Sequence, residues 1–392
     1  MDKPAVPTKL VRITTVPMSL KLLLKGQMRY MAQQGLDVTM ISSDGKEVPE
    51  LVEQEQCKHM AIPFTRTISP LQDLYCLLKL MVFFARYKPH IVHTHTPKAG
   101  LLGMLAGKLT SVPIRLHTIA GLPWMESHGA KKWLLKQMEK LTAWGAQQVY
   151  PNSLALLQFL QREGIATNKL AIMGNGSSNG IDCTYFSKTE QLIYQGNQLR
   201  LQNNTPKNGW VWIFVGRLVK DKGIEELVAA FLQIQQQYSN DQLWLLGATE
   251  PMLDPLSKTC QEHIHRNINI IPFGFVKDIR PHLAAAEVLC FPSYREGFPN
   301  VPMQAAAMEC TLLLSNINGC NELVQHLQNG LLVQPKSTAD LVEKMLFIRT
   351  NPILAAQLRQ NALQNITTHY AQSNLWQLWH QEYVKRMHLI HS

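Results

Sequence analysis

The stretch Trp210–Leu227 reads W-V-W-I-F-V-G-R-L-V-K-D-K-G-I-E-E-L, and it contains the transition that decides the fold. Its first six residues are apolar and rich in aromatic and β-branched side chains, which is typical of a strand. Gly216 ends this run and a short charged loop follows. From Ile224 onward the apolar positions recur with helical spacing. A strand that passes through a tight turn into an amphipathic helix is the repeating unit of parallel α/β sheets.

The same alternation of strand-like runs and helical patterns extends along the whole chain. The strand-like runs begin at Val11, Val38, Met60, Ile91, Ile114, Val149 and Leu170 in the first half, and at Trp210, Leu243, Ile268, Val288, Leu312 and Leu331 in the second. We therefore predict two doubly wound halves, each with a parallel sheet covered on both faces. Ligands of such sheets bind beyond the carboxyl ends of the strands, and a cleft between the halves is the expected site.

A polar segment at residues 186–208 interrupts the pattern and indicates the boundary between the halves. A chain of 392 residues is long enough for two domains. We predict an N-terminal domain of residues 1–200 and a C-terminal domain of residues 201–370. A final helix over residues 371–392 is expected to pack back on the first domain.

The composition is that of a globular protein, with 46% hydrophobic and 17% charged residues. Seven cysteines without paired spacing favour reduced thiols, and no Cys or His spacing indicates a metal site. The opening M-D-K-P-A-V-P-T-K leads directly into a strand and no apolar run reaches about 18 residues, so we expect neither a signal peptide nor a spanning helix. The net charge of +10 favours an anionic partner: nucleic acid, a lipid surface or a phosphate-bearing substrate.

Two cations follow the strand of the opening stretch. Arg217 and Lys222 lie between Gly216 and the helix that begins at Ile224, with Asp221 in position to cap that helix. The free N–H groups and the dipole of a helix N-terminus add to such cations and make an anion site. A solvated charged turn is the alternative.

A single carboxylate, Glu296, stands on a second strand-to-helix turn, P292-S-Y-R-E-G-F-P-N. Gly297 allows the backbone to approach a ligand closely, and a carboxylate accepts hydrogen bonds from the hydroxyls of a polyol. The alternative is an acid that interacts only with the dipole of the following helix.

Three histidines and one glycine-rich turn also lie at strand ends. His117 precedes Ala120 and Gly121, where it could contact a substrate or act as a base. His93 and His95 share one strand face but lack a third metal ligand, so we interpret them as core or rim residues. The turn at residues 174–180, G-N-G-S-S-N-G, departs from the dinucleotide spacing and predicts left-handed backbone instead.

Two helical stretches are basic as well as amphipathic. In residues 131–145, Lys132, Lys136 and Lys140 recur every four residues beside Trp133, and Lys21, Lys25 and Arg29 form a similar stripe in a helix predicted over residues 20–33. Such faces suit a membrane interface with anionic lipid. An ordinary surface helix with a packed apolar side is the alternative.

The chain resembles the family 4 glycosyltransferases, which are retaining, nucleotide-sugar-dependent enzymes of the two-Rossmann GT-B fold. The resemblance rests on F214-V-G-R-L-V-K-D-K-G, P292-S-Y-R-E-G-F-P-N and S315-N-I-N-G-C-N-E-L-V-Q-H-L-Q-N-G-L-L-V, in that order, together with I91-V-H-T-H-T-P-K-A-G-L-L-G. It covers nearly the whole chain and is especially strong toward bacterial enzymes that build capsular or O-antigen polysaccharide on a lipid diphosphate carrier.

The resemblance implies a role for each motif residue. Arg217 and Lys222 would hold the donor diphosphate, Glu296 would contact the donor sugar, and His117 would face the reacting centre. The donor-binding set is expected to be Gly216, Gly297, Phe298, Pro299, Asn300 and Gln304. Gln304 stands where the family usually has an acid that contacts the ribose, and its amide can still bond a ribose hydroxyl at a loss of roughly 1 kcal/mol. The loop V16-P-M-S-L-K lacks the Gly pair that the family usually has there.

The implied activity is retaining transfer of a hexose or N-acetylhexosamine from a nucleotide sugar, UDP-linked on family habit, to an undecaprenyl-diphosphate-linked saccharide in surface polysaccharide synthesis. No metal, other cofactor or nucleic acid is expected. The N-terminal domain would bind acceptor and the C-terminal domain donor. The enzyme would be cytoplasmic and peripheral at the inner face of the cytoplasmic membrane, with Lys132, Trp133, Lys136 and Lys140 facing the lipid. A nucleotide-sugar epimerase of the same fold and a non-catalytic sugar or anion binder are the alternatives.

Overall fold

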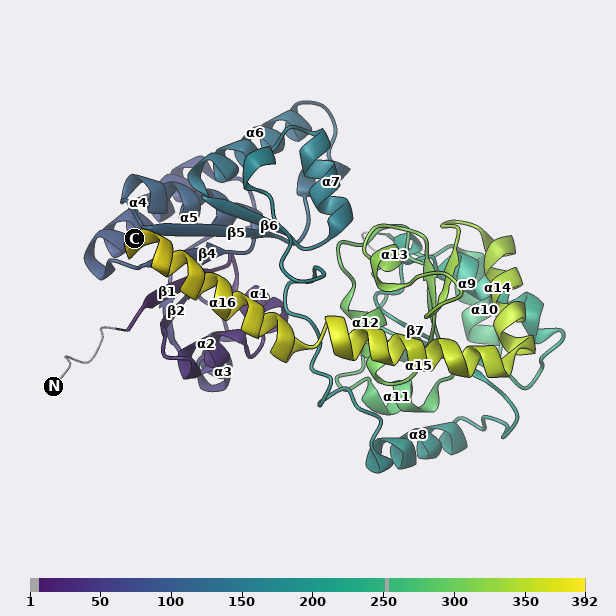
Figure 1. The fold of residues 1–392 in the computed structure, drawn as a ribbon. Helices are drawn as coiled ribbons and strands as arrows, with labels where there is room; N and C mark the ends of the chain where they lie inside the picture. The colour runs from purple at the N-terminus through teal and green to yellow at the C-terminus, as the bar shows by residue number, and fades with distance from the viewer. Residues whose placement is uncertain (1–6, 251–253, 392) are drawn as a thin grey trace. The chain divides into compact units, whose positions relative to one another are not determined.

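The computed structural model describes residues 7–250 and 254–391 (Figure 1). The first six residues of the opening segment, on which the signal-peptide expectation partly rests, lie outside the described residues. Within the described residues, no helix is both long and apolar enough to cross a bilayer. The chain forms two compact units, one ending at Gly180 and resuming at Gln372, the other spanning Ile181–Ala371.

The first unit is built on a six-stranded parallel sheet with the order β3-β2-β1-β4-β5-β6. Its strands are β1 Lys9–Ile13, β2 Asp37–Ser42, β3 Lys58–Ala61, β4 Ile91–Thr94, β5 Ile114–Ile119 and β6 Gln148–Pro151. Its helices are α1 Pro17–Leu23, α2 Gln27–Gln33, α3 Val48–Glu55, α4 Pro70–Tyr87, α5 Pro97–Leu109, α6 Gly129–Gly145, α7 Leu154–Arg162 and α16 Gln372–His391, with short 3₁₀ turns at Pro123–Glu126 and Thr167–Lys169.

Two apolar clusters fill the two faces of this first sheet. Helices α4, α5, α6 and α7 supply the cluster on one face. Helices α1, α2, α3 and α16 supply the other, so the last helix of the chain is part of this unit. Tyr383 of α16 accepts a 2.6 Å hydrogen bond from the buried guanidinium of Arg12 on β1, which ties α16 to the middle of the sheet.

The second unit repeats the architecture with the order β12-β11-β10-β7-β8-β9, again with every pairing parallel. Its strands are β7 Val211–Val215, β8 Gln242–Leu246, β9 Ile270–Gly274, β10 Val288–Phe291, β11 Thr311–Ser315 and β12 Leu331–Val333. Its helices are α8 Glu190–Gln202, α9 Ile224–Gln235, α10 Lys258–Arg266, α11 Arg280–Ala285, α12 Asn300–Ala307, α13 Cys320–Leu323, α14 Thr338–Thr350 and α15 Pro352–His369, with a 3₁₀ turn at Lys220–Lys222. The predicted fold class, two doubly wound parallel sheets, is confirmed.

Three local predictions need correction. The run at Leu170 makes only a single bridge to Val149 and is not a strand of the sheet. The helix predicted over residues 20–33 is two helices, because Gly26 has a φ of +80° that a continuing helix cannot contain. Lys21, Lys25 and Arg29 therefore do not form one helical stripe, and Lys21 pairs with Glu50 at 2.5 Å.

The boundary between the units also differs from the predicted position after residue 200. Helix α8 packs closely on α11, and both belong to the second unit. The polar composition at the end of α8 suggested a linker, but its buried Leu192 and Gly196 face α11 and the neighbouring core. The division therefore falls at Gly180, after a turn in which Gly174, Gly176 and Ser177 have the positive φ angles that the sequence predicts.

Candidate active site

The strand order of the second sheet brings two of the predicted loops together. Strands β7 and β10 are hydrogen-bonded neighbours, and the direction in which the chain winds across the sheet reverses between them. The loops that leave two such strands in opposite directions open a crevice at the carboxyl edge of a parallel sheet. Residues 216–223 follow β7 and residues 292–299 follow β10, so two of the four motifs of the resemblance lie at this reversal point.

Lys222 and Glu296 form an ion pair at this point. Nζ of Lys222 lies 2.5 Å from Oε1 of Glu296, and the two side chains are only 16% and 15% exposed. The hydroxyl of Ser293 is 3.5 Å from the same Nζ and is itself held by the carbonyl of Arg295 at 3.0 Å. A cation and a carboxylate thus share a largely desolvated position where a charged, hydroxyl-bearing ligand could separate them.

Gly223 allows the two loops to approach this closely. Its φ is +70°, and a Cβ at this position would lie 2.2 Å from the carbonyl oxygen of Pro292. Gly319, before α13, makes a similar approach to the carbonyl of Gly297. Any side chain at either glycine would push the loops apart.

A second set of contacts braces the loop that carries Glu296. The backbone N–H of Tyr294 donates to the carbonyl of Asp221 at 2.9 Å, and the Tyr294 hydroxyl donates to Glu226 at 2.6 Å. Arg295 pairs with the Asp221 carboxylate at 3.0 Å. Asp221 was expected to cap α9, but that helix has Gly223 at its N-cap and no side-chain cap. The sequence motif includes these residues, yet only the structure shows that they hold one loop against the other.

Arg217 lies on the same edge but has a different partner. Its guanidinium pairs with Glu250, which follows β8, at 2.7 Å, and the Arg217 side chain is half exposed. Glu250 borders a cavity of about 280 Å³ whose walls include Leu218, Thr249, Leu256 and Pro272. Arg217 is therefore a half-exposed, paired cation next to a cavity, whereas the Lys222–Glu296 pair is largely buried.

The remaining donor-site candidates lie at the start of α12. Pro299 is its N-cap, and the helix begins at Asn300 without a side-chain cap, which leaves the N–H groups of the first turn available to a ligand. Phe298 packs against the ring of Tyr370 with 5.5 Å between centroids, so it anchors the turn. Gln304, one turn into the helix, is partly exposed.

His117, in the first unit, is not at the protein surface. Its ring is 2% exposed and fills the space that a Cβ on Gly100 of α5 would enter. Nδ1 is 2.7 Å from the Thr94 hydroxyl, and Nε2 is 3.9 Å from the Glu139 carboxylate on α6. Burial lowers the pKa of His117 to about 4 and raises the pKa of Glu139 to about 7. The imidazole is therefore neutral at pH 7, and it bonds the Thr94 hydroxyl at the end of β4.

The other two histidines of β4 differ from each other. His93 is satisfied on both ring nitrogens, by Tyr383 at 2.7 Å and Thr118 at 2.8 Å, which confirms its interpretation as a core residue. His95 follows the strand at the carboxyl edge and is 4% exposed, and neither of its ring nitrogens has a partner among the described residues. Periodicity alone could not distinguish these two positions.

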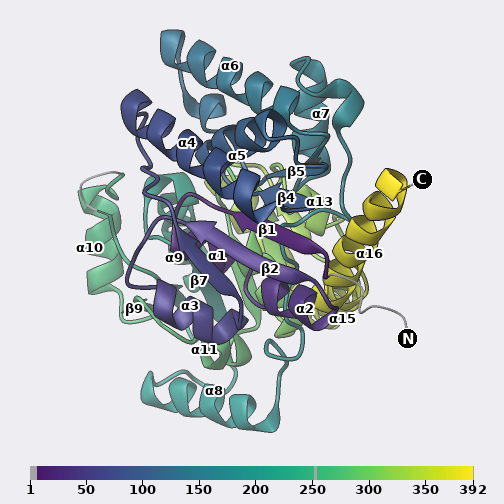
Figure 2. The same cartoon turned by 90° about the vertical axis from the view of Figure 1, so that its left-hand side faces the viewer.

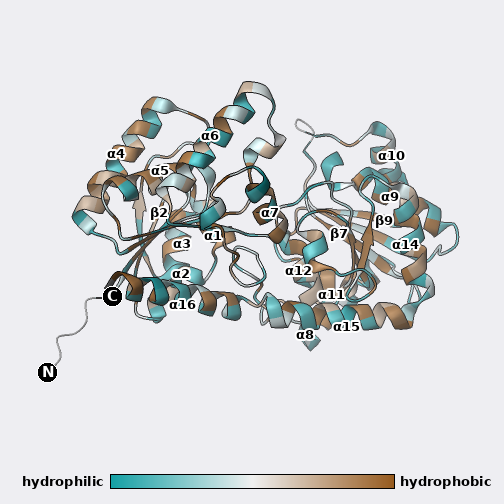
Figure 3. Ribbon diagram, turned by 45° about the horizontal axis from the view of Figure 1, so that its top comes forward, coloured by the Kyte–Doolittle hydropathy of each residue, from teal (hydrophilic) through white to brown (hydrophobic). Residues whose placement is uncertain are grey.

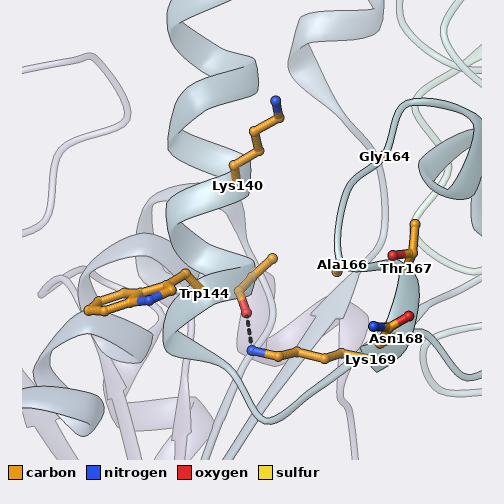
Figure 4. Close-up of a pocket in the computed structure, with 8 residues that line it drawn as sticks. Lys140, Trp144, Gly164, Ala166, Thr167, Asn168 and Lys169 are labelled. Carbon is orange, nitrogen blue, oxygen red and sulfur yellow. Dashed lines mark hydrogen bonds between the residues drawn. The ribbon is translucent and has the colours of Figure 1, made fainter.

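The predicted membrane-facing residues lie on α6. Trp133 is 64% exposed and Lys132 and Lys140 are exposed, whereas Lys136 pairs with Glu163 at 2.5 Å. Near the end of α6, Lys140 and Trp144 line a shallow cavity of about 300 Å³ with Thr167, Asn168 and Lys169 (Figure 4). The Lys169 ammonium is engaged by the carbonyls of Ala143 and Ala146, at the end of α6. Lys169 therefore caps the C-terminal end of α6 at one wall of this cavity.

Comparison with known proteins gives the same division of the chain into two halves. The family model of the group 1 glycosyl transferases matches residues 197–365. The family model of the glycosyl transferase 4-like domain matches residues 24–176. The capsular polysaccharide biosynthesis glycosyltransferase CapM of Staphylococcus aureus is 30% identical over 370 residues, covering 94% of this chain and 95% of its own length. An Escherichia coli enzyme, UDP-Gal:alpha-D-GlcNAc-diphosphoundecaprenol alpha-1,3-galactosyltransferase, is 24% identical over 338 residues, which is 84% of each chain.

Among solved structures, Anabaena HepE in complex with UDP and glucose superposes with a TM-score of 0.80 at 18% identity, over 96% of this chain and 100% of that one. A glycosyltransferase from Rickettsia africae superposes with a TM-score of 0.81, also at 18% identity, over 97% and 99% of the two chains. The protein is a glycosyltransferase of the GT-B class. Within that class, the chain belongs to family 4, the family that its sequence motifs resemble.

Proposed function

We propose that the protein is a retaining hexosyl- or N-acetylhexosaminyltransferase that uses a UDP-linked donor and a lipid-linked saccharide acceptor in surface polysaccharide synthesis. The Lys222–Glu296 pair at the reversal point of the second sheet is the observation that carries the proposal. A UDP-sugar has an anionic diphosphate and a hydroxyl-rich ring joined at one atom, and the pair offers one group to each. Three similar proteins support this proposal: CapM acts in capsular polysaccharide biosynthesis, the E. coli galactosyltransferase uses a diphosphoundecaprenol-linked acceptor, and HepE has been crystallised with UDP and glucose.

Donor binding would open the ion pair. Lys222 then turns to the diphosphate, with Arg217 and the free N–H groups of α12 as further donors, while Glu296 accepts hydrogen bonds from the sugar hydroxyls. Because the leaving diphosphate gains negative charge in the transition state, a preorganised cation lowers the barrier more than it tightens donor binding. Gln304 contacts the ribose through its amide, and Gly216 and residues 297–300 line the donor.

Retention is proposed to arise on one face of the sugar. Retaining glycosidases use two carboxyl groups about 5 Å apart. Glu296 is paired with Lys222, and no second carboxylate is paired with it among the residues that the structure describes. We therefore assign no carboxylate nucleophile: the departing phosphate oxygen accepts the proton of the incoming hydroxyl while the new glycosidic bond forms on the same face. His117 is a positioning residue in this scheme, because its ring supports Thr94 at the end of β4.

A lipid-linked acceptor would place the enzyme at the inner face of the cytoplasmic membrane. The exposed Trp133, Lys132 and Lys140 on α6 suit an anionic lipid surface. A diphospho-undecaprenol acceptor is also named for a similar protein from Campylobacter jejuni. That protein is N,N'-diacetylbacillosaminyl-diphospho-undecaprenol alpha-1,3-N-acetylgalactosaminyltransferase.

The test is a transfer assay with a panel of UDP-sugars and a short-chain polyprenyl-diphosphate saccharide acceptor. The anomeric configuration of the product is read by NMR. An α-linked product from an α-linked donor supports the proposal, and an inverted product refutes retention. Incubation with donor alone separates the epimerase: an isomerised sugar without acceptor would favour that activity. Nucleotide-sugar binding without either reaction would favour a non-catalytic binder.

A further inference from the structure

A buried chain of polar side chains joins the last helix of the protein to the first sheet. Helix α16 lies beside α2 against one face of this sheet (Figure 2). The helix is mixed in hydropathy (Figure 3), and it supplies Leu375, Trp379 and Tyr383 to the core on that face. Apolar packing is sufficient to hold such a helix in place, whereas buried polar groups cost free energy. The polar chain beneath α16 therefore needs an explanation of its own.

The chain begins at Arg12 on β1 and passes through three further side chains. The guanidinium of Arg12 donates to the Tyr383 hydroxyl at 2.6 Å. The same hydroxyl lies 2.7 Å from Nδ1 of His93 on β4, and Nε2 of His93 lies 2.8 Å from the hydroxyl of Thr118 on β5. None of the four residues is more than 3% exposed. Water therefore does not compete for these hydrogen bonds, and each bond strengthens its neighbours.

The chemistry of the four groups gives each bond a direction. Burial holds the pKa of His93 well below its usual value, so at pH 7 the ring has one donor and one acceptor nitrogen. Burial raises the pKa of Tyr383 to about 12, so its hydroxyl keeps the proton. Because a guanidinium can only donate, the Tyr383 oxygen accepts from Arg12. The hydroxyl proton then goes to Nδ1 of His93, its other partner among the residues that the structure describes. Nε2 consequently carries the ring proton and donates to Thr118.

The chain ends at the carboxyl edge of the first sheet. Thr118 is the last residue but one of β5 and precedes the turn at Ala120 and Gly121. The ring of His93 also lies 4.2 Å from the ring of His95, which follows β4. Strands β1 and β4 are neighbours, and the winding direction of this sheet reverses between them. Ligands of doubly wound sheets bind outside the strand ends at such a point.

A second hydroxyl also links α16 to the sheet, but its bonds end locally. Tyr150 of β6 donates to Glu382 at 2.6 Å and accepts from Arg386 at 3.1 Å. Glu382 and Arg386 form an ion pair within α16, and Arg386 also donates to Gln148 of β6 at 3.0 Å. These bonds fasten α16 to β6 without Tyr383. The Tyr383 hydroxyl therefore has a part to play besides fastening the helix.

We propose that Tyr383 is a positioning residue for the acceptor side of the reaction. Its hydroxyl fixes the tautomer of His93, and His93 in turn holds Thr118 and the ring of His95 at the carboxyl edge. Without that hydroxyl the imidazole could exchange its donor and acceptor nitrogens, and the bond to Thr118 would no longer be enforced. The inference rests on the proposed function, with the first unit taking the acceptor.

The kinetic experiment compares Tyr383→Phe with Tyr150→Phe in the transfer assay of the full chain. Each variant removes one buried hydroxyl that links α16 to the sheet, so Tyr150→Phe is the matched control. Tyr383→Phe should raise the acceptor KM about tenfold and leave the donor KM unchanged. Tyr150→Phe should leave both KM values close to those of the wild type, although its thermal stability falls by a similar amount.

A double-variant experiment tests whether Tyr383 and Thr118 act through one chain. Thr118→Val removes the hydroxyl at the far end and nearly preserves the shape of the side chain. If both ends serve one chain, Tyr383→Phe/Thr118→Val should raise the acceptor KM no further than the more severe single variant does. Multiplied effects of the two substitutions would show that the residues act independently and would overturn the proposal.

NMR spectroscopy of the chain without substrates provides a readout that a merely structural role would not move. Long-range ¹H–¹⁵N spectra distinguish protonated from unprotonated ring nitrogens, and His93 is assigned by its absence in His93→Gln. Nε2 should be protonated and Nδ1 unprotonated in the wild type and in Tyr150→Phe. Tyr383→Phe should lose this preference, and its amides at residues 119–122 should exchange with solvent faster than those of Tyr150→Phe.

Three results would each overturn the proposal: a protonated Nδ1 in the wild type, an unchanged acceptor KM in Tyr383→Phe, or the same rise of acceptor KM in both tyrosine variants. A wild-type protein that transfers to no acceptor would refute the proposed function instead. The tautomer and amide exchange would then decide the positioning role. It stands if only Tyr383→Phe changes them, and it falls if Tyr150→Phe changes them equally or neither variant does.

Discussion

Lys222 and Glu296 are 74 residues apart in the chain, yet their Nζ and Oε1 atoms lie 2.5 Å apart at the carboxyl edge of the second sheet. Both side chains are largely buried, so water screens the attraction between the two charges only weakly. The pair places an ammonium and a carboxylate side by side. A nucleotide sugar, which has both a diphosphate and a sugar ring, could bind to both groups.

Lys222→Ala should lower kcat about 10²- to 10³-fold, because the variant lacks one preorganised charge aimed at the leaving group. The fold should remain intact by circular dichroism. Lys220→Ala, two residues away and exposed, is the matched control and should be close to wild type. Near-normal turnover of Lys222→Ala would remove this lysine from the mechanism.

Glu296→Ala should reduce kcat/KM about 100-fold, the loss expected for two charge-assisted hydrogen bonds to sugar hydroxyls. Binding of UDP alone, measured by calorimetry, should be at least as tight as in wild type. UDP lacks the sugar, and Lys222 would have lost its carboxylate partner. Weaker UDP binding would show that Glu296 supports the diphosphate site and not the sugar site.

Gln304→Glu should retain activity, since either side chain can accept a hydrogen bond from a ribose hydroxyl. Gln304→Leu removes the bond and should raise the donor KM about fivefold, which corresponds to roughly 1 kcal/mol. Steady-state kinetics with varied donor measure both. An inactive Gln304→Glu variant would mean that position 304 has a task other than ribose contact.

Gly223→Ala should lower the free energy of unfolding by about 3 kcal/mol, because the residue has positive φ and its Cβ would overlap the Pro292 carbonyl. Gly164→Ala is a matched control: its φ of +66° is similar, but nothing lies within 4 Å of the new Cβ. That control should cost only about 1 kcal/mol. Chemical denaturation compares the two, and equal losses would show that the loop can shift without cost.

The buried Glu139 should make stability depend on pH. Its pKa is raised by burial from 4.5 to about 7, so between these values the folded chain holds a proton that the unfolded chain releases. This carboxyl therefore lowers the free energy of unfolding as pH rises through that range. Glu139→Gln removes this pH dependence. Between pH 5 and 8, the free energy of unfolding of the variant should therefore rise relative to that of the wild type by up to about 3 kcal/mol.

His117, whose Nε2 lies 3.9 Å from the Glu139 carboxylate, acts in the opposite direction and at lower pH. Burial lowers its pKa to about 4, so stability rises with pH from about 4 to 6.5 in both proteins. Denaturation curves of wild type and Glu139→Gln at several pH values isolate the Glu139 contribution. A stability difference that stays constant with pH would show that Glu139 is ionised in the folded chain.

Much of the fold was predictable because its signals are local. Strand runs such as Val211–Val215 and Val288–Phe291 alternate with stretches of helical periodicity. This alternation is enough to predict a doubly wound parallel sheet. The predictions that failed depended on neighbours distant in the chain. Gly26 breaks a helix where the indole of Trp376 from α16 packs against it, and α8 joins the second unit because α11 covers it.

The alternating elements, the two halves, the glycine turns and the motif residues could all be predicted from the sequence. They depend on local apolar periodicity and on backbone geometry at single positions. Tertiary structure alone decided which of those residues meet. It paired Lys222 with Glu296 through the adjacency of β7 and β10. It enclosed His117 beneath α5 although the residue lies near a strand end. The physical reason is that burial and pairing depend on which segments pack together, and packing joins residues that are far apart in the sequence.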